Sequence, residues 1–328
     1  MNNFIQPDAK IFVAGHNGLA GGAIVRKLRA VGYENLLLRT HAQIDLEDEG
    51  QVRALFGDER PEFVFLAAAK VGGILANRDF PADFIARNLR IQSNVIENAF
   101  RFGVRRLLFL GSSCIYPKMA PQPIGEEQLL AGPLEFTNRS YAVAKIAGIE
   151  MCWAYNRQHG TSYLAVMPTN LYGPGDNYDL ASSHVLPALI RKVHEAKERG
   201  ENNLVVWGTG TPLREFLYSD DMADGCVFLM NLPETEFAGL VRKPKMAPLV
   251  NLGSGSELTI GELARTVCDV LGFRGEIVFD SSKPDGTPRK LMDSAKLFSY
   301  GWRPKVALED GIRMAYDDFC SRMTAVKK

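Results

Sequence analysis

The sequence predicts an α/β fold in which a doubly wound parallel sheet is joined to a smaller mixed α/β C-terminal domain. In the first half of the chain, short apolar runs alternate with longer amphipathic stretches, and each run is apolar throughout. Strands of that kind are covered on both faces, as in a parallel sheet whose crossovers are helices. A glycine-rich turn follows the first apolar run, and the pattern changes after Gly173. These three observations predict the fold class.

The expected elements follow one another in strand–helix order. We expect strands at residues 10–14, 34–39, 63–68, 106–111 and 163–167, and helices at 19–31, 52–56, 83–102 and 141–159. After Gly173 prolines and glycines become frequent, which indicates a less regular domain that covers a substrate. A helix at 220–230 and a strand at 249–252 are expected to return to the sheet. The dinucleotide-binding domain therefore takes residues 1–172 and about 216–254, and the substrate-binding domain takes about 173–215 and 255–328.

Composition excludes several classes of protein. The chain has 328 residues, with 38 Lys and Arg against 38 Asp and Glu, so it has no net basic field for nucleic acid. No apolar run approaches the ~18 residues of a membrane span, and the N-terminal residues do not read as a signal peptide. The five cysteines show no CxxC spacing, which argues against a disulfide framework or a zinc site. A reducing cytoplasm fits these features best.

The glycine-rich turn between the first strand and the first helix predicts a dinucleotide site. Glycines stand at 15, 18 and 21, and glycine lets backbone N–H groups approach a pyrophosphate at a helix N-terminus. Glycine turns often serve only as turns, but this one lies in the first strand–helix–strand unit, which makes the fold Rossmann-type. The residues expected around the cofactor here are Gly15, Asn17, Gly18, Leu19, Ala20 and Gly21.

The end of the second expected strand indicates which nicotinamide cofactor is used. Arg39 lies there without an adjacent acidic residue, whereas an Asp or Glu would be expected to bind a ribose 2′-hydroxyl. A charge-assisted contact between arginine and a 2′-phosphate favours NADP. The alternative is that Arg39 is a solvent-exposed residue, and Asp45 further along could reach the adenine side.

Tyr141 and Lys145 predict the catalytic chemistry. Residues four apart share one face of a helix, so both side chains point into the same cleft. A nearby ammonium favours phenolate, so we expect Tyr141 to exchange a proton closer to neutral pH than its ordinary pKa of about 10. Ser112, at the end of a strand, is placed to bind the same substrate oxygen. This arrangement is typical of proton transfer at a carbonyl beside a hydride carrier.

Cys114 and His184 each leave two interpretations open. If the extended conformation continues beyond Ser112, Cys114 faces the same side and could deprotonate a carbon next to a ketone, provided that its pKa falls. Otherwise Cys114 is a small buried apolar residue. His184 is either the opposing acid or a structural histidine.

Taken together, these motifs resemble the extended short-chain dehydrogenases/reductases that act on nucleotide sugars. The resemblance rests on the glycine turn, Leu66–Ala68, Ser112, the YxxxK motif and Pro168–Pro174. Four narrower segments are similar to the branch of that family that converts GDP-4-keto-6-deoxy-D-mannose to GDP-L-fucose by 3,5-epimerisation and 4-reduction: Ala69–Ile74, Gly111–Pro117, Ser183–Pro187 and Lys283–Lys290. The resemblance covers about residues 10–320.

The resemblance implies NADPH as reductant, a GDP-sugar as substrate and roles for individual residues. Tyr141 is implied as proton donor to O4, Lys145 as its partner and ribose ligand, Ser112 as carbonyl ligand, Cys114 as base and His184 as acid. Further cofactor contacts are implied for His41, Leu110, Gly111, Ser113, Lys145, Pro168, Asn170, Leu171 and His184, and substrate contacts for Lys192, Trp207, Arg214, Asp285 and Lys290.

The chain also departs from the pattern of its bacterial relatives. Asn17 and His41 stand where basic residues are frequent near the 2′-phosphate, which leaves Arg39 as the clearer anion partner and weakens the expected preference for NADP. Lys192 replaces an arginine and supplies charge without a bidentate fork. A homodimer through the helices at 83–103 and 141–159 is implied by the resemblance alone. The alternatives are a related 4-reductase or 4-epimerase, for example in GDP-L-colitose formation, and an inactive NADP-binding scaffold.

Overall fold

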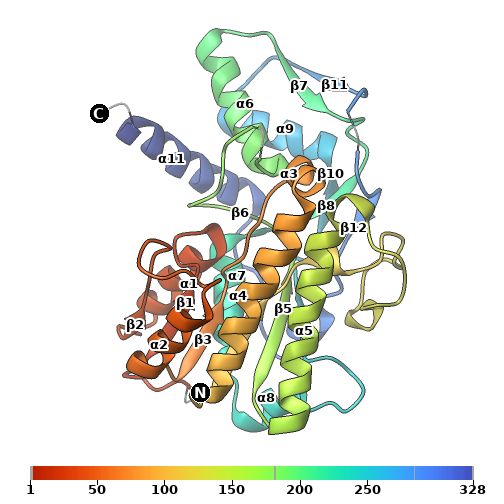
Figure 1. Ribbon diagram of the computed structural model, residues 1–328. Coiled ribbons are helices and arrows are strands. Elements are labelled where there is room, and N and C mark those ends of the chain that lie inside the picture. The colour runs from red at the N-terminus through yellow and green to blue at the C-terminus, as the bar shows by residue number, and fades with distance from the viewer. Residues whose placement is uncertain (1–2, 181, 284, 327–328) are drawn as a thin grey trace.

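A sheet of six parallel strands organises the larger lobe of the computed structural model, which describes residues 3–180, 182–283 and 285–326 (Figure 1). The strands lie in the order β2-β1-β3-β4-β5-β9. Their bounds are Leu36–Leu37 (β2), Ile11–Ala14 (β1), Phe63–Leu66 (β3), Arg106–Leu110 (β4), Tyr163–Pro168 (β5) and Leu249–Leu252 (β9). The order reverses between β1 and β3, and ligands of doubly wound sheets bind at such a switch point.

Helices cover both faces of this sheet. Strand residues alternate between the faces, so Val13 packs into one core and Phe12 into the other. The first core is closed by α1 (Leu19–Ala30), α7 (Ser219–Met230) and α8 (Glu234–Val241). The second core is closed by α2 (Glu49–Glu59), α4 (Pro81–Arg101) and α5 (Arg139–His159), of which α4 and α5 stand in front in Figure 1. The short α3 (Ile74–Asp79) leads into α4.

The smaller lobe lies beyond the carboxyl ends of these strands and has a third core. Its mixed sheet contains β6 (Asn170–Tyr172), β8 (Leu213–Tyr218), β10 (Glu257–Thr259) and β12 (Arg289–Lys290), and a parallel pair is formed by β7 (Asn203–Trp207) and β11 (Glu276–Asp280). The helices are α6 (Val185–Arg199), α9 (Ile260–Leu271) and α11 (Leu308–Val326), whereas α10 (Ala295–Ser299) packs against β9 and buries Leu297 in the first core of the parallel sheet. Three 3₁₀ turns lie in the connections: η1 (Ser113–Ile115), η2 (Glu126–Gln128) and η3 (Phe136–Asn138).

Strand β8 takes part in two cores at once. Leu217 packs into the core of the parallel sheet, whereas Phe216 and Tyr218 pack into the core of the smaller lobe. The same strand pairs with β6, β10 and β12. The two lobes are therefore joined through a shared strand as well as through connecting loops.

Most expected elements of the first half are confirmed within a few residues, and the strand at 249–252 lies at its expected position. One expectation was wrong in extent. The second strand shrinks to Leu36–Leu37, an edge strand that pairs with β1. The short helix expected around residues 52–56 is confirmed as Glu49–Glu59, and Asp48 caps it by accepting the backbone N–H of Gln51 at 2.9 Å.

The proposed domain boundaries stay a prediction, and their terminal residues 1–2 and 327–328 lie outside the described part of the chain. The return of the chain to the sheet is observed, because β9 pairs with β5. Among the described residues, no helix combines the length and apolar character needed to cross a membrane.

Candidate active site

The glycine turn after β1 forms a close-packed cradle at the switch point. Gly15 has a φ of +87°, and a Cβ atom there would lie 2.7 Å from the backbone nitrogen of Ala68. A Cβ atom on Gly21 would lie 2.1 Å from the carbonyl oxygen of Gly15. Helix α1 begins just after Gly18 without a side-chain cap and without an acidic residue in its first turn. Its first backbone N–H groups are thus available to a pyrophosphate, and the cradle fits a dinucleotide.

Arg39 has an acidic partner that the local sequence does not reveal. Its Nη2 lies 2.5 Å from Oε1 of Glu59 at the end of α2, and Nζ of Lys10 lies 3.1 Å from the other oxygen of that carboxylate. Glu59 therefore holds the guanidinium in place and offsets part of its charge. His41 is largely exposed, with Nδ1 3.9 Å from Asp45. Arg39 remains the predicted contact of a 2′-phosphate.

The structure corrects the expected path of the chain between Ser112 and Cys114. The extended conformation ends at Ser112, where η1 begins, so the alternation of a strand does not place the thiol. The 3₁₀ turn η1 determines the position of the thiol instead, and the hydroxyl of Ser112 accepts the backbone N–H of Cys114 at 3.4 Å. The same hydroxyl interacts with the thiol of Cys114 and with the phenol of Tyr141. Ser112 thus stands between the two groups.

Tyr141 and Lys145 lie on one face of α5, as their spacing predicts. The Tyr141 ring packs edge-on against Phe84 of α4, with ring centroids 6.1 Å apart. The ammonium of Lys145 donates to the carbonyl oxygen of Leu110 at 2.7 Å and lies 5.8 Å from the centroid of the Tyr141 ring. Lys145 is therefore tied to the end of β4, where the catalytic loop begins.

The expected lowering of the Tyr141 pKa is wrong for this arrangement. Burial raises the pKa of Tyr141, the nearby Cys114 raises it further, and the hydrogen bond with Ser112 only partly opposes them. Burial also lowers the pKa of Lys145 to about 8. The ammonium is directed at a carbonyl oxygen instead of the phenol oxygen, so it does not favour phenolate. Tyr141 keeps its proton at neutral pH, which suits a proton donor.

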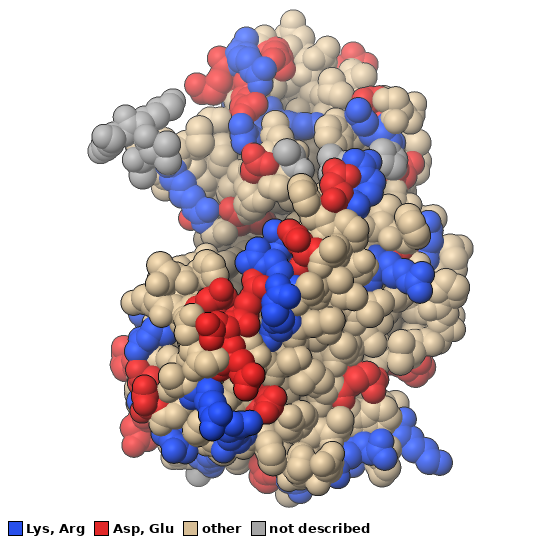
Figure 2. Space-filling model, viewed as in Figure 1, with Lys and Arg blue, Asp and Glu red and all other residues tan. Residues whose placement is uncertain are grey.

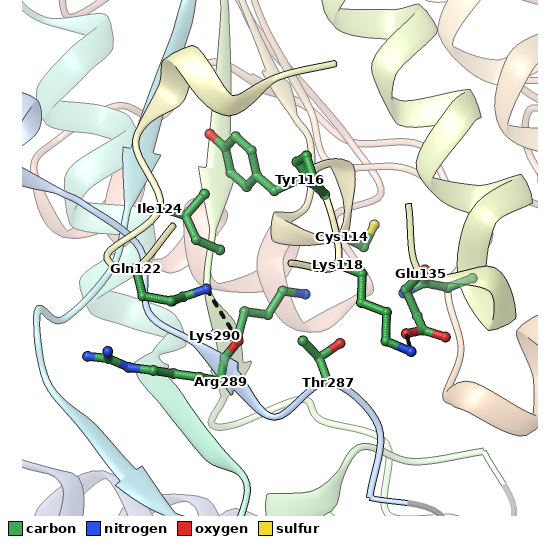
Figure 3. A pocket seen from close by; sticks show the side chains of 11 residues that line it. Cys114, Tyr116, Lys118, Gln122, Ile124, Glu135, Thr287, Arg289 and Lys290 are labelled. Carbon is green, nitrogen blue, oxygen red and sulfur yellow. Dashed lines mark hydrogen bonds and ion pairs between the residues drawn. The ribbon is translucent and has the colours of Figure 1, made fainter. Parts of the chain in front are cut away.

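Cys114 lies on the wall of a recess beside this group, and Figure 3 shows it above the extended side chain of Lys290 in that view. The residue is 7% exposed, and burial raises the pKa of its thiol. Lys290 opposes that rise most strongly, followed by Ser112 and Lys145. The thiol therefore lies among two amines and a hydroxyl, in surroundings that differ from those of an apolar core.

His184 lies at the N-terminus of α6, opposite the sheet. Its ring is accessible to solvent but surrounded by protein, and this desolvation lowers its pKa, with Lys290 lowering it further. The imidazole is consequently neutral at pH 7, while the thiol of Cys114 is protonated. Lys290, which lines the recess together with Cys114, lies close enough to influence the pKa of both Cys114 and His184.

Trp207 forms the far end of the predicted substrate site. Its ring is 48% exposed at the end of β7, with Nζ of Lys192 5.0 Å and Nζ of Lys283 5.5 Å from the ring centroid. A flat aromatic face beside two cations suits a nucleobase linked to phosphates. Lys283 was not predicted, although it lies in one of the quoted segments. Pro284 of that segment lies outside the described residues.

Arg214 and Asp285 are neighbours, with Nη2 of Arg214 3.5 Å from the carbonyl oxygen of Asp285. Arg214 is desolvated, which lowers its pKa, and Asp285 opposes this effect. Asp285 already accepts the backbone N–H of Thr209 at 2.8 Å and its hydroxyl at 2.9 Å. Its predicted role as a hydrogen-bond acceptor for the substrate therefore competes with its structural role in holding Thr209. The proximity of Arg214 to Lys290 connects this region with the recess.

Other predicted cofactor contacts line the ends of β4, β5 and β6. A Cβ atom on Gly111 would lie 2.0 Å from Cε of Met167, so this position is closely packed. Asn170 follows Pro168 and donates its amide to the carbonyl oxygen of Glu215 at 2.7 Å. Ser113 is buried, and Leu171 lies on β6 next to Asn170. These positions form one edge at the carboxyl ends of the strands.

Sequence reasoning missed several residues that line the recess. They come from the loop after η1, from the segment before α5 and from the strand β12 region: Lys118, Gln122, Glu135, Asn138, Thr287 and Arg289. Helical spacing was a usable signal for Asn138, which precedes Tyr141 by three positions. The others are brought in by tertiary packing.

Residues 11–240 match the model of the NAD dependent epimerase/dehydratase family. The chain belongs to this family. Those residues include the glycine cradle, Ser112, Cys114, Tyr141, Lys145 and His184.

Within the family the chain is similar to GDP-sugar enzymes over nearly its whole length. It is 59% identical to GDP-L-fucose synthase 1 of Arabidopsis thaliana over 317 residues, covering 97% of this chain and 95% of the relative. It is 51% identical to the GDP-L-fucose synthase of Escherichia coli, covering 94% and 96%. A GDP-L-colitose synthase of Yersinia pseudotuberculosis is 36% identical, covering 92% and 95%. A solved GDP-L-fucose synthetase from Naegleria fowleri bound to NADP is 30% identical with a TM-score of 0.88, covering 99% and 96%.

Proposed function

We propose that the protein converts GDP-4-keto-6-deoxy-D-mannose to GDP-L-fucose, by epimerisation at C3 and C5 followed by NADPH-dependent reduction at C4. The observation that carries the proposal is that the thiol of Cys114 and the phenol of Tyr141 influence one another and that both interact with the hydroxyl of Ser112. A plain reductase needs only the hydroxyl, the phenol and the amine. The similarity to GDP-L-fucose synthases supports the same conclusion.

Epimerisation is assigned to Cys114 and His184. The 4-ketone acidifies the protons on C3 and C5, and Cys114 removes one while Ser112 and Tyr141 stabilise the negative charge that develops on O4. His184 returns a proton to the opposite face of the ring. This proton transfer needs Cys114 as thiolate and His184 as imidazolium. That form contains the same number of protons as the neutral thiol–imidazole pair, and it arises when one proton moves from the thiol to the imidazole.

Reduction is assigned to Tyr141 with support from Lys145. When bound, NADPH supplies the hydride that reduces C4. Tyr141 holds its proton at neutral pH and donates it to O4 as the alkoxide develops. Reduction follows epimerisation, because it removes the ketone that acidifies C3 and C5.

The ligands divide between the two lobes. NADP is assigned to the cradle of α1, with Arg39 at its 2′-phosphate and the N–H groups of α1 at its pyrophosphate. The GDP moiety is assigned to Trp207, Lys192 and Arg214: Lys192 lies over the aromatic face of Trp207, and Arg214 supplies a further cation for the phosphates.

A homodimer through α4 and α5 is also part of the proposal. The outward surface over α5 carries few charged side chains in Figure 2. Phe100 and Val143 of these helices are exposed apolar residues, 38% each. A second copy would cover them. A cytoplasmic location stays a prediction from the sequence.

Product analysis by NMR after incubation of the ketosugar with NADPH tests the function. We expect GDP-L-fucose, formed with solvent deuterium at C3 and C5 when the reaction runs in D₂O. A product reduced at C4 without deuterium at those carbons would indicate a simple 4-reductase. Turnover only on the 3-deoxy ketosugar would indicate GDP-L-colitose formation, and NADPH binding without turnover on either sugar would indicate a scaffold.

A further inference from the structure

The recess beside Cys114 contains a carboxamide that the proposed mechanism leaves unused. The recess is open to solvent, and its walls include Lys118, Glu135, Asn138, Thr287 and Lys290. Figure 3 shows Lys118 and Glu135 paired on one side and Lys290 extending across the centre. Nζ of Lys118 lies 2.8 Å from Oε2 of Glu135, so these two charges form an ion pair. The carboxamide of Asn138 is neutral and takes no part in that pair.

Asn138 lacks the capping hydrogen bond that an asparagine at the start of a helix normally makes. It is the N-cap residue of α5, a place where asparagine usually accepts a backbone N–H and stabilises the helix by about 1 kcal/mol. Its side chain makes no capping bond here. Its Oδ1 atom is buried and finds no hydrogen-bond partner in the part of the chain that the structure describes. Buried polar atoms are nearly always paired, so an unpaired one that lines a recess points to a ligand.

The position of Asn138 relative to Tyr141 and Cys114 selects the atom that it binds. Asn138 is the N-cap residue of α5, and Tyr141 lies three residues later in the first turn of that helix. It lines the same recess as Cys114. Of the two carbons that Cys114 is proposed to deprotonate, only C3 carries a hydroxyl, whereas C5 carries a methyl group and the ring oxygen. A carboxamide both donates and accepts hydrogen bonds, which suits a hydroxyl.

We propose that Asn138 binds the 3-hydroxyl of the ketosugar and thereby holds C3 against Cys114; this inference rests on the proposed function. The bond serves recognition as well as orientation. A site that binds a substrate hydroxyl discriminates against an analogue without it, because its polar group is then left unpaired. Asn138 is thus a specificity residue that separates 3-hydroxy from 3-deoxy ketosugars.

Kinetics of two variants on two sugars test this role. The substrates are GDP-4-keto-6-deoxy-D-mannose and its 3-deoxy analogue. Three quantities are measured: kcat/KM for NADPH oxidation, deuterium uptake at C3 of the 3-hydroxy sugar, and Tm. Asn138→Ala is compared with Asn35→Ala, which removes a carboxamide that donates to the carbonyl oxygen of Asp8 at 3.0 Å, far from the recess. We expect Asn138→Ala to lose about tenfold in kcat/KM on the 3-hydroxy sugar and less than about twofold on the 3-deoxy analogue, with an unchanged Tm. Asn35→Ala should leave both activities unchanged.

The outcomes separate this role from the function on which it rests. Equal losses on the two sugars, or a loss of activity accompanied by a lowered Tm, would overturn the contact with the 3-hydroxyl while leaving the reaction intact. A wild-type protein that turned over neither sugar would overturn the proposed function and, with it, the role of Asn138. A loss confined to the 3-hydroxy sugar supports both.

Discussion

Replacing Cys114 with serine tests the group that distinguishes an epimerase-reductase from a reductase. The thiol lies in the recess with Ser112, Lys145 and Lys290 around it, and burial keeps its pKa above the ordinary value of 9.0. A serine hydroxyl at the same place keeps the shape but ionises far less readily. We therefore expect deuterium uptake at C3 and C5 to fall by at least about tenfold, and by about 100-fold if the thiol is the sole base.

The assay is NMR of the ketosugar in D₂O with NADP⁺ present, so that exchange proceeds without reduction. NADPH binding, followed by fluorescence, serves as the control and should not change, because Cys114 lies on the recess wall and contributes nothing to the glycine cradle. Unchanged deuterium uptake in Cys114→Ser would remove the thiol from the mechanism and leave a plain 4-reductase.

The pH profile of the same exchange tests the pairing with His184. The pKa of His184 lies below its ordinary 6.5 and that of Cys114 above its ordinary 9.0. Between these limits the pair holds a constant number of protons, so the fraction in the thiolate–imidazolium form is constant. We expect exchange to be flat from about pH 6.5 to 9 and to fall on either side. A tenfold rise per pH unit across that range would mean that thiolate acts without protonated His184.

Three further substitutions test other parts of the site and fold. Tyr141→Phe should reduce NADPH oxidation by about 100-fold or more, because the proton donor to O4 is lost; near-normal consumption would contradict its role. Arg39→Ala should weaken binding of NADPH more than binding of NADH, measured by fluorescence titration at low and high salt, since only NADPH presents a 2′-phosphate; equal losses would exclude that contact. Asp48→Ala should lower stability by about 1 kcal/mol in urea unfolding without changing activity, because the residue caps α2; an unchanged unfolding midpoint would show that the cap is dispensable.

The sequence predicted the sheet well, because strands that are apolar on both faces are typical of a parallel sheet covered by helices on both sides. It predicted the shared face of Tyr141 and Lys145 for a similar reason, since helical spacing is a local property. It failed on the path to Cys114, because the 3₁₀ turn of η1 depends on the hydroxyl of Ser112 capping the following residues.

The electrostatics of the site were less predictable than its geometry. The pKa of Tyr141 depends on how deeply the phenol is buried and on where Lys145 points, and the carbonyl oxygen of Leu110 decides the latter. The partner of Arg39 lies 20 positions away on another helix. Such contacts follow from packing between elements, which periodicity along one segment does not encode.

Strand β8 restricts the movement of the two lobes relative to one another, and thereby the way in which substrate can enter. Because Leu217 is anchored in the core of one lobe and its neighbours in the core of the other, the lobes cannot open like a clamshell without exposing apolar surface on both. The distance from the nucleotide-binding wall to the hydride-transfer position is therefore set by the backbone before any ligand arrives. Entry and exit of a bulky nucleotide sugar must then rely on movements of side chains and surface loops around the recess.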